Sequence, residues 1–152
     1  MTTTLTRADT PTPVASASGE AILEHIAEAV IYANRNGVIE RWNTAAAQMF
    51  GFSAAEVIGQ RLDLMIPEQL RAAHWRGFDA AMKGGVLRLN GRATLTRGLH
   101  KSGRKLYIEM SFALVRDGAG AVLGSVAVAR EVTERVESEK AARATAAARP
   151  AD

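Results

Sequence analysis

The chain has 152 residues, of which 47% are hydrophobic and 23% are charged, a composition that suits one soluble domain with a buried core. It contains no cysteine, which excludes disulfide bonds, thiolate metal sites, thiol catalysis and cysteinyl adducts with a flavin. The formal net charge of +3 permits an acidic partner without requiring one.

The N-terminal residues 1–18 are rich in Thr, Ser, Ala and Pro without periodicity, which is typical of a disordered leader. They carry no signal-peptide pattern, and nowhere does the chain hold about 18 consecutive apolar residues, so we predict neither secretion nor a membrane span. We therefore expect a cytoplasmic protein with a folded domain at 19–130 and a flanking helix and tail at 131–152.

The first half of the domain alternates apolar strand patterns with helix-capping residues. Asn36-Gly37 supplies the positive φ angles of a type I′ hairpin turn, and Ser53 with Glu56 forms a capping box. In chain order we expect a helix or turn from Gly19, a strand at 30–33, its hairpin partner at 38–42, a helix at 45–49 and a helix from Ser53 that ends at Gly59.

The second half opens with a longer helix and continues with an antiparallel meander. The helix begins at Pro67-Glu68 and ends at Gly84-Gly85. From Arg130 onward the charged, alanine-rich segment predicts an exposed helix. Its apolar stripe is too thin to keep the helix folded without a partner. The three strand-like runs between these helices are 87–99, 105–115 and 122–129.

This order of elements is that of PAS sensor domains, and the residues from Ala21 to Lys140 resemble that family. The resemblance implies an α+β fold, namely the PAS fold: a five-stranded antiparallel sheet with short helices over one face, a C-terminal flanking helix, and a pocket for a cofactor or small ligand. The matching segments are VIERWNTAA at 38–46, MFGF at 49–52, EVIGQ at 56–60, LMIPE at 64–68, KSGR at 101–104 and AREVTER at 129–135.

His74 is the residue that most needs an explanation. Leu70, His74, Phe78 and Met82 recur at four-residue spacing, so a helix turns the imidazole toward the core, where a titratable ring needs a partner. In the haem-binding PAS oxygen sensors, which this stretch resembles, the proximal histidine lies six residues after the glutamate of a Pro-Glu pair. The resemblance therefore implies haem b, with iron bound by His74, and sensing of O₂, CO, NO or redox state.

Further cofactor contacts are expected on both sides of the pocket. Arginines near His74 in the sequence are suited to pair with haem propionates, and the resemblance places Thr94 at the position of the sensors' distal arginine, with Arg92 one strand period earlier. The alternation of residues 106–112 puts Ile108, Met110 and Phe112 on one face, as a dry distal wall. The full set of cofactor-binding candidates is His74, Trp75, Phe78, Arg92, Thr94, Ile108, Met110 and Phe112.

Three alternatives stay open at this stage. One is noncovalent FAD, with Trp42 and Trp75 as stacking partners. Another is a ligand-free PAS module that serves only dimerisation, in which His74 is an ordinary packed histidine. The third is a stand-alone haem enzyme of the oxygenase or peroxygenase type, which activates O₂ or peroxide with Arg92 or Thr94 as the distal polar group.

The partners expected from the resemblance are a diatomic gas or small ligand and a second copy of the chain, bound through the flanking helices. A separate signalling partner would receive the output. Ten basic residues stand against three acidic ones between Arg61 and Lys105, which suits a solvated face or a carboxylate-bearing ligand; it is no sufficient ground to predict nucleic-acid binding.

Overall fold

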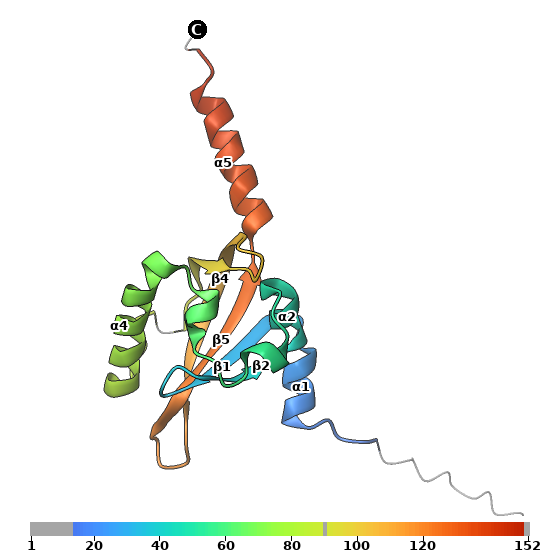
Figure 1. The fold of residues 1–152 in the computed structure, drawn as a ribbon, viewed down its shortest axis with the longest axis vertical. Helices are drawn as coiled ribbons and strands as arrows, with labels where there is room; N and C mark the ends of the chain where they lie inside the picture. Colours follow the sequence, from blue (N-terminus) through green and yellow to red (C-terminus); the bar gives the residue numbers. More distant parts are fainter. Residues whose placement is uncertain (1–13, 90, 151–152) are drawn as a thin grey trace, which may run out of the picture.

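The computed structural model describes residues 14–89 and 91–150, so most of the predicted leader lies outside the described residues. The helices lie mainly in the first half of the chain and the long strands in the second (Figure 1). The elements are α1 (Gly19–His25), β1 (Ala29–Asn34), β2 (Ile39–Trp42), α2 (Thr44–Phe50), α3 (Ala54–Val57), the 3₁₀ helix η1 (Leu62–Met65), α4 (Glu68–Gly84), β3 (Thr94–Leu99), β4 (Lys105–Arg116), β5 (Val122–Glu131) and α5 (Thr133–Ala147).

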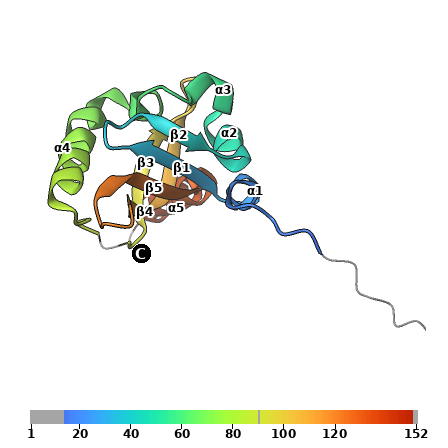
Figure 2. The same cartoon turned by 90° about the horizontal axis from the view of Figure 1, so that it is seen from below.

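The five strands form one antiparallel sheet in the order β2-β1-β5-β4-β3. Helices α2, α3 and α4 lie over one face of this sheet, as Figure 2 shows. The core lies between these two layers, where alternate strand residues such as Ile31, Leu106, Ile108 and Ala129 are buried. This architecture confirms the predicted fold class.

Asn43 joins α1, β1 and α2 at the start of the fold. Its Oδ1 accepts from the backbone N–H of Val30 at 2.9 Å and of Ala46 at 3.0 Å, so it caps α2 while it fixes the strand. Its Nδ2 donates to the carbonyls of Leu23 and Glu28 at 3.1 and 3.0 Å. Because Asn43 is only 4% exposed, these bonds satisfy a buried polar group and set the register of three elements at once.

The predicted strand at 87–99 is shorter in the structure, where β3 begins only at Thr94. The residues before it turn instead: the backbone N–H of Arg92 donates to the carbonyl of Leu89 at 3.0 Å, and Gly91 has a φ of +76°. The predicted strand was therefore too long, because it included the turn that precedes β3. One short element, η1, was not predicted as a separate helix.

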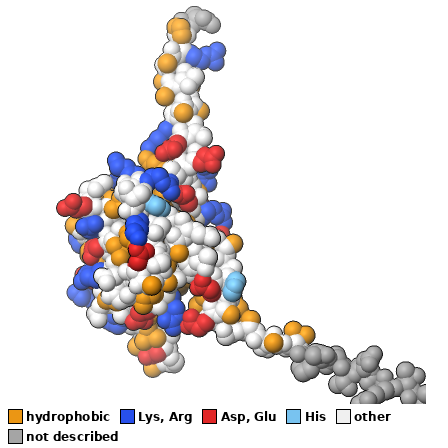
Figure 3. All heavy atoms as spheres, turned by 45° about the vertical axis from the view of Figure 1, so that its right-hand side comes forward, with side chains coloured by type: hydrophobic (Ala, Val, Ile, Leu, Met, Phe, Trp, Pro, Cys, Tyr) orange, Lys and Arg blue, Asp and Glu red, His pale blue; other side chains and the backbone are white. Residues whose placement is uncertain are grey.

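Helix α5 leaves the domain as a projecting rod (Figure 1). Val136 is its one buried residue, which agrees with the thin apolar stripe seen in the sequence. The space-filling view shows acidic and basic side chains interspersed over the body of the domain (Figure 3). Among the described residues, no helix is both long and apolar enough to cross a membrane.

Trp75 fastens α4 to the first hairpin. Its indole Nε1–H donates to Asp63 Oδ1 at 2.8 Å, and the guanidinium of Arg61 lies 4.2 Å from the ring centroid on its face. The ring also covers Gly37, at a position where any Cβ would overlap it. Gly37 has a φ of +73°, so both the turn and the tryptophan require glycine there.

We expect Gly37→Ala to lower the free energy of unfolding by about 3 kcal/mol, because it adds a left-handed alanine and an overlap with Trp75. Gly59→Ala is the matched control: Gly59 also has a positive φ, of +85°, but an added Cβ meets no atom within 4 Å. It should cost only about 1 kcal/mol. Urea denaturation of both variants checks this, and equal losses would show that Trp75 does not constrain Gly37.

Candidate functional site

A cavity of about 370 Å³ lies between α4 and the inner face of the sheet. This volume is within the range of small-molecule and cofactor sites in proteins. Ala73 and Gly77 line the cavity and are themselves exposed, so it opens to solvent beside α4. The lining residues come mainly from one face of α4, from η1, from alternate positions of β1, β4 and β5, and from residues 96–98 of β3.

The lining face of α4 follows the helical period and combines large with small residues. Phe78 and Met82 reach the core and are buried, whereas Ala73 and Gly77 leave the space in front of them free. A Cβ added to Gly77 would meet nothing within 4 Å. The cavity therefore exists where α4 lacks side chains large enough to reach the sheet.

His74 lies in this wall, half-buried, between an edge-on contact with Trp75 at 4.8 Å and Phe78 at 6.0 Å between ring centroids. Its Nδ1 is buried and has no hydrogen-bond partner within residues 14–89 and 91–150. Burial lowers the pKa of the imidazole below its ordinary value, against the opposing charges of Asp63 and Asp79. The ring is therefore neutral near pH 7 and has a nitrogen lone pair to give.

The sheet side of the cavity is mostly apolar. Ile108, Met110 and Phe112 of β4 all line it, as the alternation of that run indicates, and Ala127 of β5 lies beside them. Polar side chains are sparse on this wall, so a ligand there is shielded from water along most of its length.

Two hydroxyl groups lie at opposite ends of the sheet wall, and sequence reasoning missed both. Thr96 pairs with Ile108 across β3 and β4, and Ser125 pairs with Leu114 across β4 and β5. Ile108 and Leu114 are six residues apart on one strand, which separates the two ends by about 20 Å. Counting back from the hairpin turn at 100–103 would have found Thr96, because Gly98 pairs with the buried Leu106 and the residue two positions before it faces the same side.

Three of the predicted cofactor residues do not line the cavity. Trp75 is turned to Gly37 and Asp63, as described above. Arg92 is exposed in the turn before β3, and Thr94, although on the same face as Thr96, lies beyond the lining. Trp42, considered for flavin stacking, donates to the carbonyl of Phe52 at 3.0 Å and also lies outside the lining.

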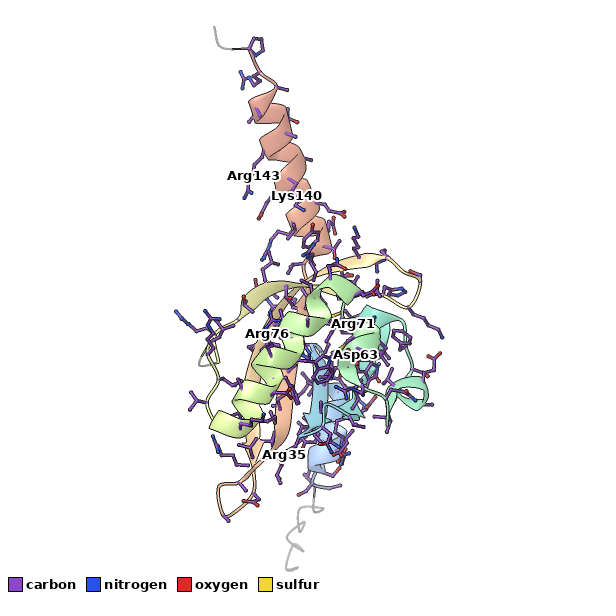
Figure 4. The ribbon with its side chains drawn as sticks, turned by 60° about the vertical axis from the view of Figure 1, so that its left-hand side comes forward. Arg35, Asp63, Arg71, Arg76, Lys140 and Arg143 are labelled. Atoms are coloured by element: carbon purple, nitrogen blue, oxygen red, sulfur yellow. The ribbon has the colours of Figure 1, made fainter. Side chains whose placement is uncertain are left out.

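The basic residues near His74 take varied positions. Arg71 uses its Nε to donate to the carbonyl of Ile66 at 3.0 Å, and both Arg71 and Arg76 project from α4 in Figure 4. Arg97, which the sequence did not single out, also borders the cavity, although it lies opposite Tyr107 on the outer face of β3 and is exposed. No signal in the sequence distinguished it from its basic neighbours.

The residues present fit a haem group. One neutral imidazole can hold a haem iron, and His74 is a neutral imidazole in an apolar wall, with a buried nitrogen that has no partner among the described residues. Within the described part of the chain no group of three or more His, Cys, Asp or Glu residues is placed to hold a metal ion. A porphyrin supplies four nitrogens itself and needs no such group.

Comparison with known proteins identifies the family. A profile described as the PAS fold matches residues 23–137, and the chain belongs to this family. It is 27% identical over 121 residues, 80% of this chain, to the oxygen sensor protein DosP of Escherichia coli, and 40% identical over 53 residues, 35% of this chain, to the sensor protein FixL of Bradyrhizobium diazoefficiens. The chain spans only 15% and 10% of the lengths of these two proteins.

The fold is also shared with solved structures. A PAS domain from Colwellia psychrerythraea superposes with a TM-score of 0.65 at 19% identity, covering 74% of this chain and 92% of that one. The domain is thus a PAS domain, and its curated relatives are sensor proteins.

The lowered pKa of His74 predicts a pH effect on the ligand-free protein. The unfolded state binds a proton near the ordinary pKa of 6.5, whereas the folded state does so only at lower pH, so stability falls as the pH drops below about 6.5. Between pH 7.5 and 5 the melting temperature of the natural protein should fall more than that of His74→Gln. His25→Gln, at an exposed site, should keep the natural slope; identical slopes in all three proteins would contradict the prediction.

Proposed function

We propose that this PAS domain senses a diatomic gas or redox state through haem b held in the cavity, with His74 as the axial ligand of the iron. The observation that carries the proposal is the buried, unpartnered Nδ1 of a neutral His74 in the wall of an apolar cavity. The similarity to an oxygen sensor protein over 80% of the chain supports the same function.

In this proposal the residues that line the cavity have different roles in binding the haem and the gas. Bound haem iron would supply an open coordination position for the gas. His74 gives one nitrogen to the metal, while Ile108, Met110 and Phe112 keep water from the opposite wall. Thr96 lines the sheet side of the cavity, and in this proposal its hydroxyl would donate a hydrogen bond to the ligand, the role first considered for Thr94.

The output would pass through α5, because the strand that forms the cavity wall also holds this helix. The backbone N–H of Val132 donates to the carbonyl of Tyr107 at 2.8 Å, and the N–H of Tyr107 donates to Thr133 Oγ1 at 3.0 Å. Tyr107 lies between Leu106 and Ile108, which are buried on the inner face. We propose that α5 then acts on a second copy of the chain or on a separate signalling partner.

The first test is haem retention by His74→Ala, expressed with ample haem. The variant should stay folded and lose at least 90% of the Soret absorbance of the natural protein, because the iron loses its protein ligand. His100→Ala, which removes a histidine from the β3–β4 turn, should retain haem. Unchanged haem content in His74→Ala would overturn the proposal.

A second test fills the cavity without touching His74. Gly77→Leu puts a large side chain into open space on the lining, so haem binding should fall at least tenfold while the melting temperature is kept or raised, since leucine favours a helix over glycine by about 1 kcal/mol. Gly77→Ala is the control that gains helix propensity with little added volume. Undiminished haem binding by Gly77→Leu would show that the ligand lies elsewhere.

A further inference from the structure

Strand β3 is an edge strand of the sheet and pairs with β4. Its hydrogen-bonding phase follows from the turn between the two strands, where the backbone N–H of His100 donates to the carbonyl of Arg104 at 2.9 Å. Because hydrogen-bonded and non-hydrogen-bonded pairs alternate along an antiparallel ladder, the register makes Arg97 and Tyr107 a non-hydrogen-bonded pair. Leu95 has the same phase two residues earlier. The N–H and C=O groups of Leu95 and Arg97 therefore point away from β4, toward the free edge.

The contacts of Tyr107 agree with this phase. Its N–H donates to Thr133 Oγ1 at 3.0 Å and its C=O accepts from the N–H of Val132 at 2.8 Å, so both groups face the side of β4 that is away from β3. Within residues 14–89 and 91–150, no turn, loop or cap hydrogen bond uses the free-edge groups of Leu95 or Arg97. These groups are available to a further strand.

A groove of about 320 Å³ lies beside this edge. It is lined by Leu70, Leu95, Thr96, Arg97 and Tyr107. Leu95 is 54% exposed although it is apolar, and Leu70 of α4 supplies a second apolar side chain to the groove. The groove therefore offers apolar contacts next to unpaired backbone groups, and this combination binds extended peptides by strand addition.

The edge is also positively charged. Arg92, Arg97 and Lys105 are exposed, and none of them forms an ion pair with a residue that the structure describes. The segment 91–108 contains no Asp or Glu. A second copy of the chain would bring the same cations to the same edge, and like charges on paired strands repel. The charge thus favours an acidic strand over a second copy.

We propose that the free edge of β3 binds an extended acidic segment of a partner protein as an additional antiparallel strand. The residue of that segment opposite Arg97 lies on the outer face of the sheet, where a carboxylate pairs with the guanidinium. Its neighbours lie on the other face, where apolar side chains contact Leu70 in the groove. The inference goes beyond the proposed function and does not depend on haem, because backbone groups and an outer-face side chain carry it.

The test is a titration of the full chain with labelled synthetic peptides, followed by fluorescence anisotropy. The acidic peptide SVEVEVS should bind at least tenfold more tightly than the basic peptide SVKVKVS, and Arg97→Glu should reverse this preference. Arg143→Glu makes the same change of charge on the projecting helix α5 (Figure 4) and should leave the preference as it is. N-methylation of both glutamates of SVEVEVS removes the N–H groups that face β3 and should weaken binding at least tenfold, whereas N-methylation of the central valine, whose N–H points away, is the matched control.

Amide hydrogen exchange gives the signature of an added strand. With saturating SVEVEVS, the N–H groups of Leu95 and Arg97 should exchange at least tenfold more slowly, whereas that of Thr96, which the same phase directs toward β4, should not change. Exchange that is not slowed at Leu95 and Arg97 would contradict the inference.

The other outcomes are equally decisive. A preference that survives in Arg97→Glu, or no binding at the highest soluble peptide concentration, overturns the inference. A single-stranded oligodeoxynucleotide of the same charge that binds as tightly as SVEVEVS would show an unselective cationic surface and also overturn it. Because the titration is made without haem, its failure leaves the proposed function untouched, and loss of the proposed function leaves the peptide result standing.

Discussion

The cavity depends on one constraint, which is that α4 is held to the rest of the domain without lying on the sheet along its length. Trp75 of α4 packs over Gly37 and donates a hydrogen bond to Asp63. These two contacts hold α4 to the β1–β2 turn and to η1. Its C-terminal end is tied by Arg35, which donates to the carbonyls of Met82 and Val122 and so joins α4 to β5. Between these attachments the helix cannot collapse onto the sheet, although an unfilled apolar space forfeits packing energy. The empty cavity therefore lowers the stability of the fold.

His74 shows the same trade at the level of one side chain. A buried polar atom without a partner costs about 1–3 kcal/mol, and most native proteins avoid it. The cost is smaller for a neutral imidazole than for a charged one, and burial lowers the pKa of His74 so that the ring is neutral. Trp75 and Phe78 also pack around it. The Nδ1 atom that remains without a partner among the described residues is a feature that packing alone does not require.

The sequence was sufficient for most of the elements and for the inward position of His74, because both follow from local periods, whereas the arrangement of the elements was implied by the resemblance to the PAS family. The four-residue spacing on α4 and the two-residue alternation on β4 correctly indicated which faces look inward. Errors arose where a contact joins residues far apart in the chain. Trp75 was assigned to the cofactor since nothing local shows that it packs on Gly37, and Arg92 was placed on a strand because a turn at Gly91 interrupts an otherwise strand-like run. The face of β3 on which Arg97 lies is set by its register opposite Tyr107, which depends on the length of the hairpin.

The attachment of α5 to the domain rests on few contacts. The helix buries one of its residues and is otherwise held by polar contacts at its base, among them the ion pair between Arg135 and Glu109 at 3.1 Å. Such contacts are weak individually and belong to the low end of local stability, so under the proposed function a change at β4 would be enough to alter the orientation or order of the helix. Glu109 and Tyr107 point outward from the strand whose inward residues, Ile108 and Met110, form the cavity wall. One strand therefore carries the cavity wall on one face and the attachment of α5 on the other, so that only the thickness of a single sheet separates the cavity from the base of the helix.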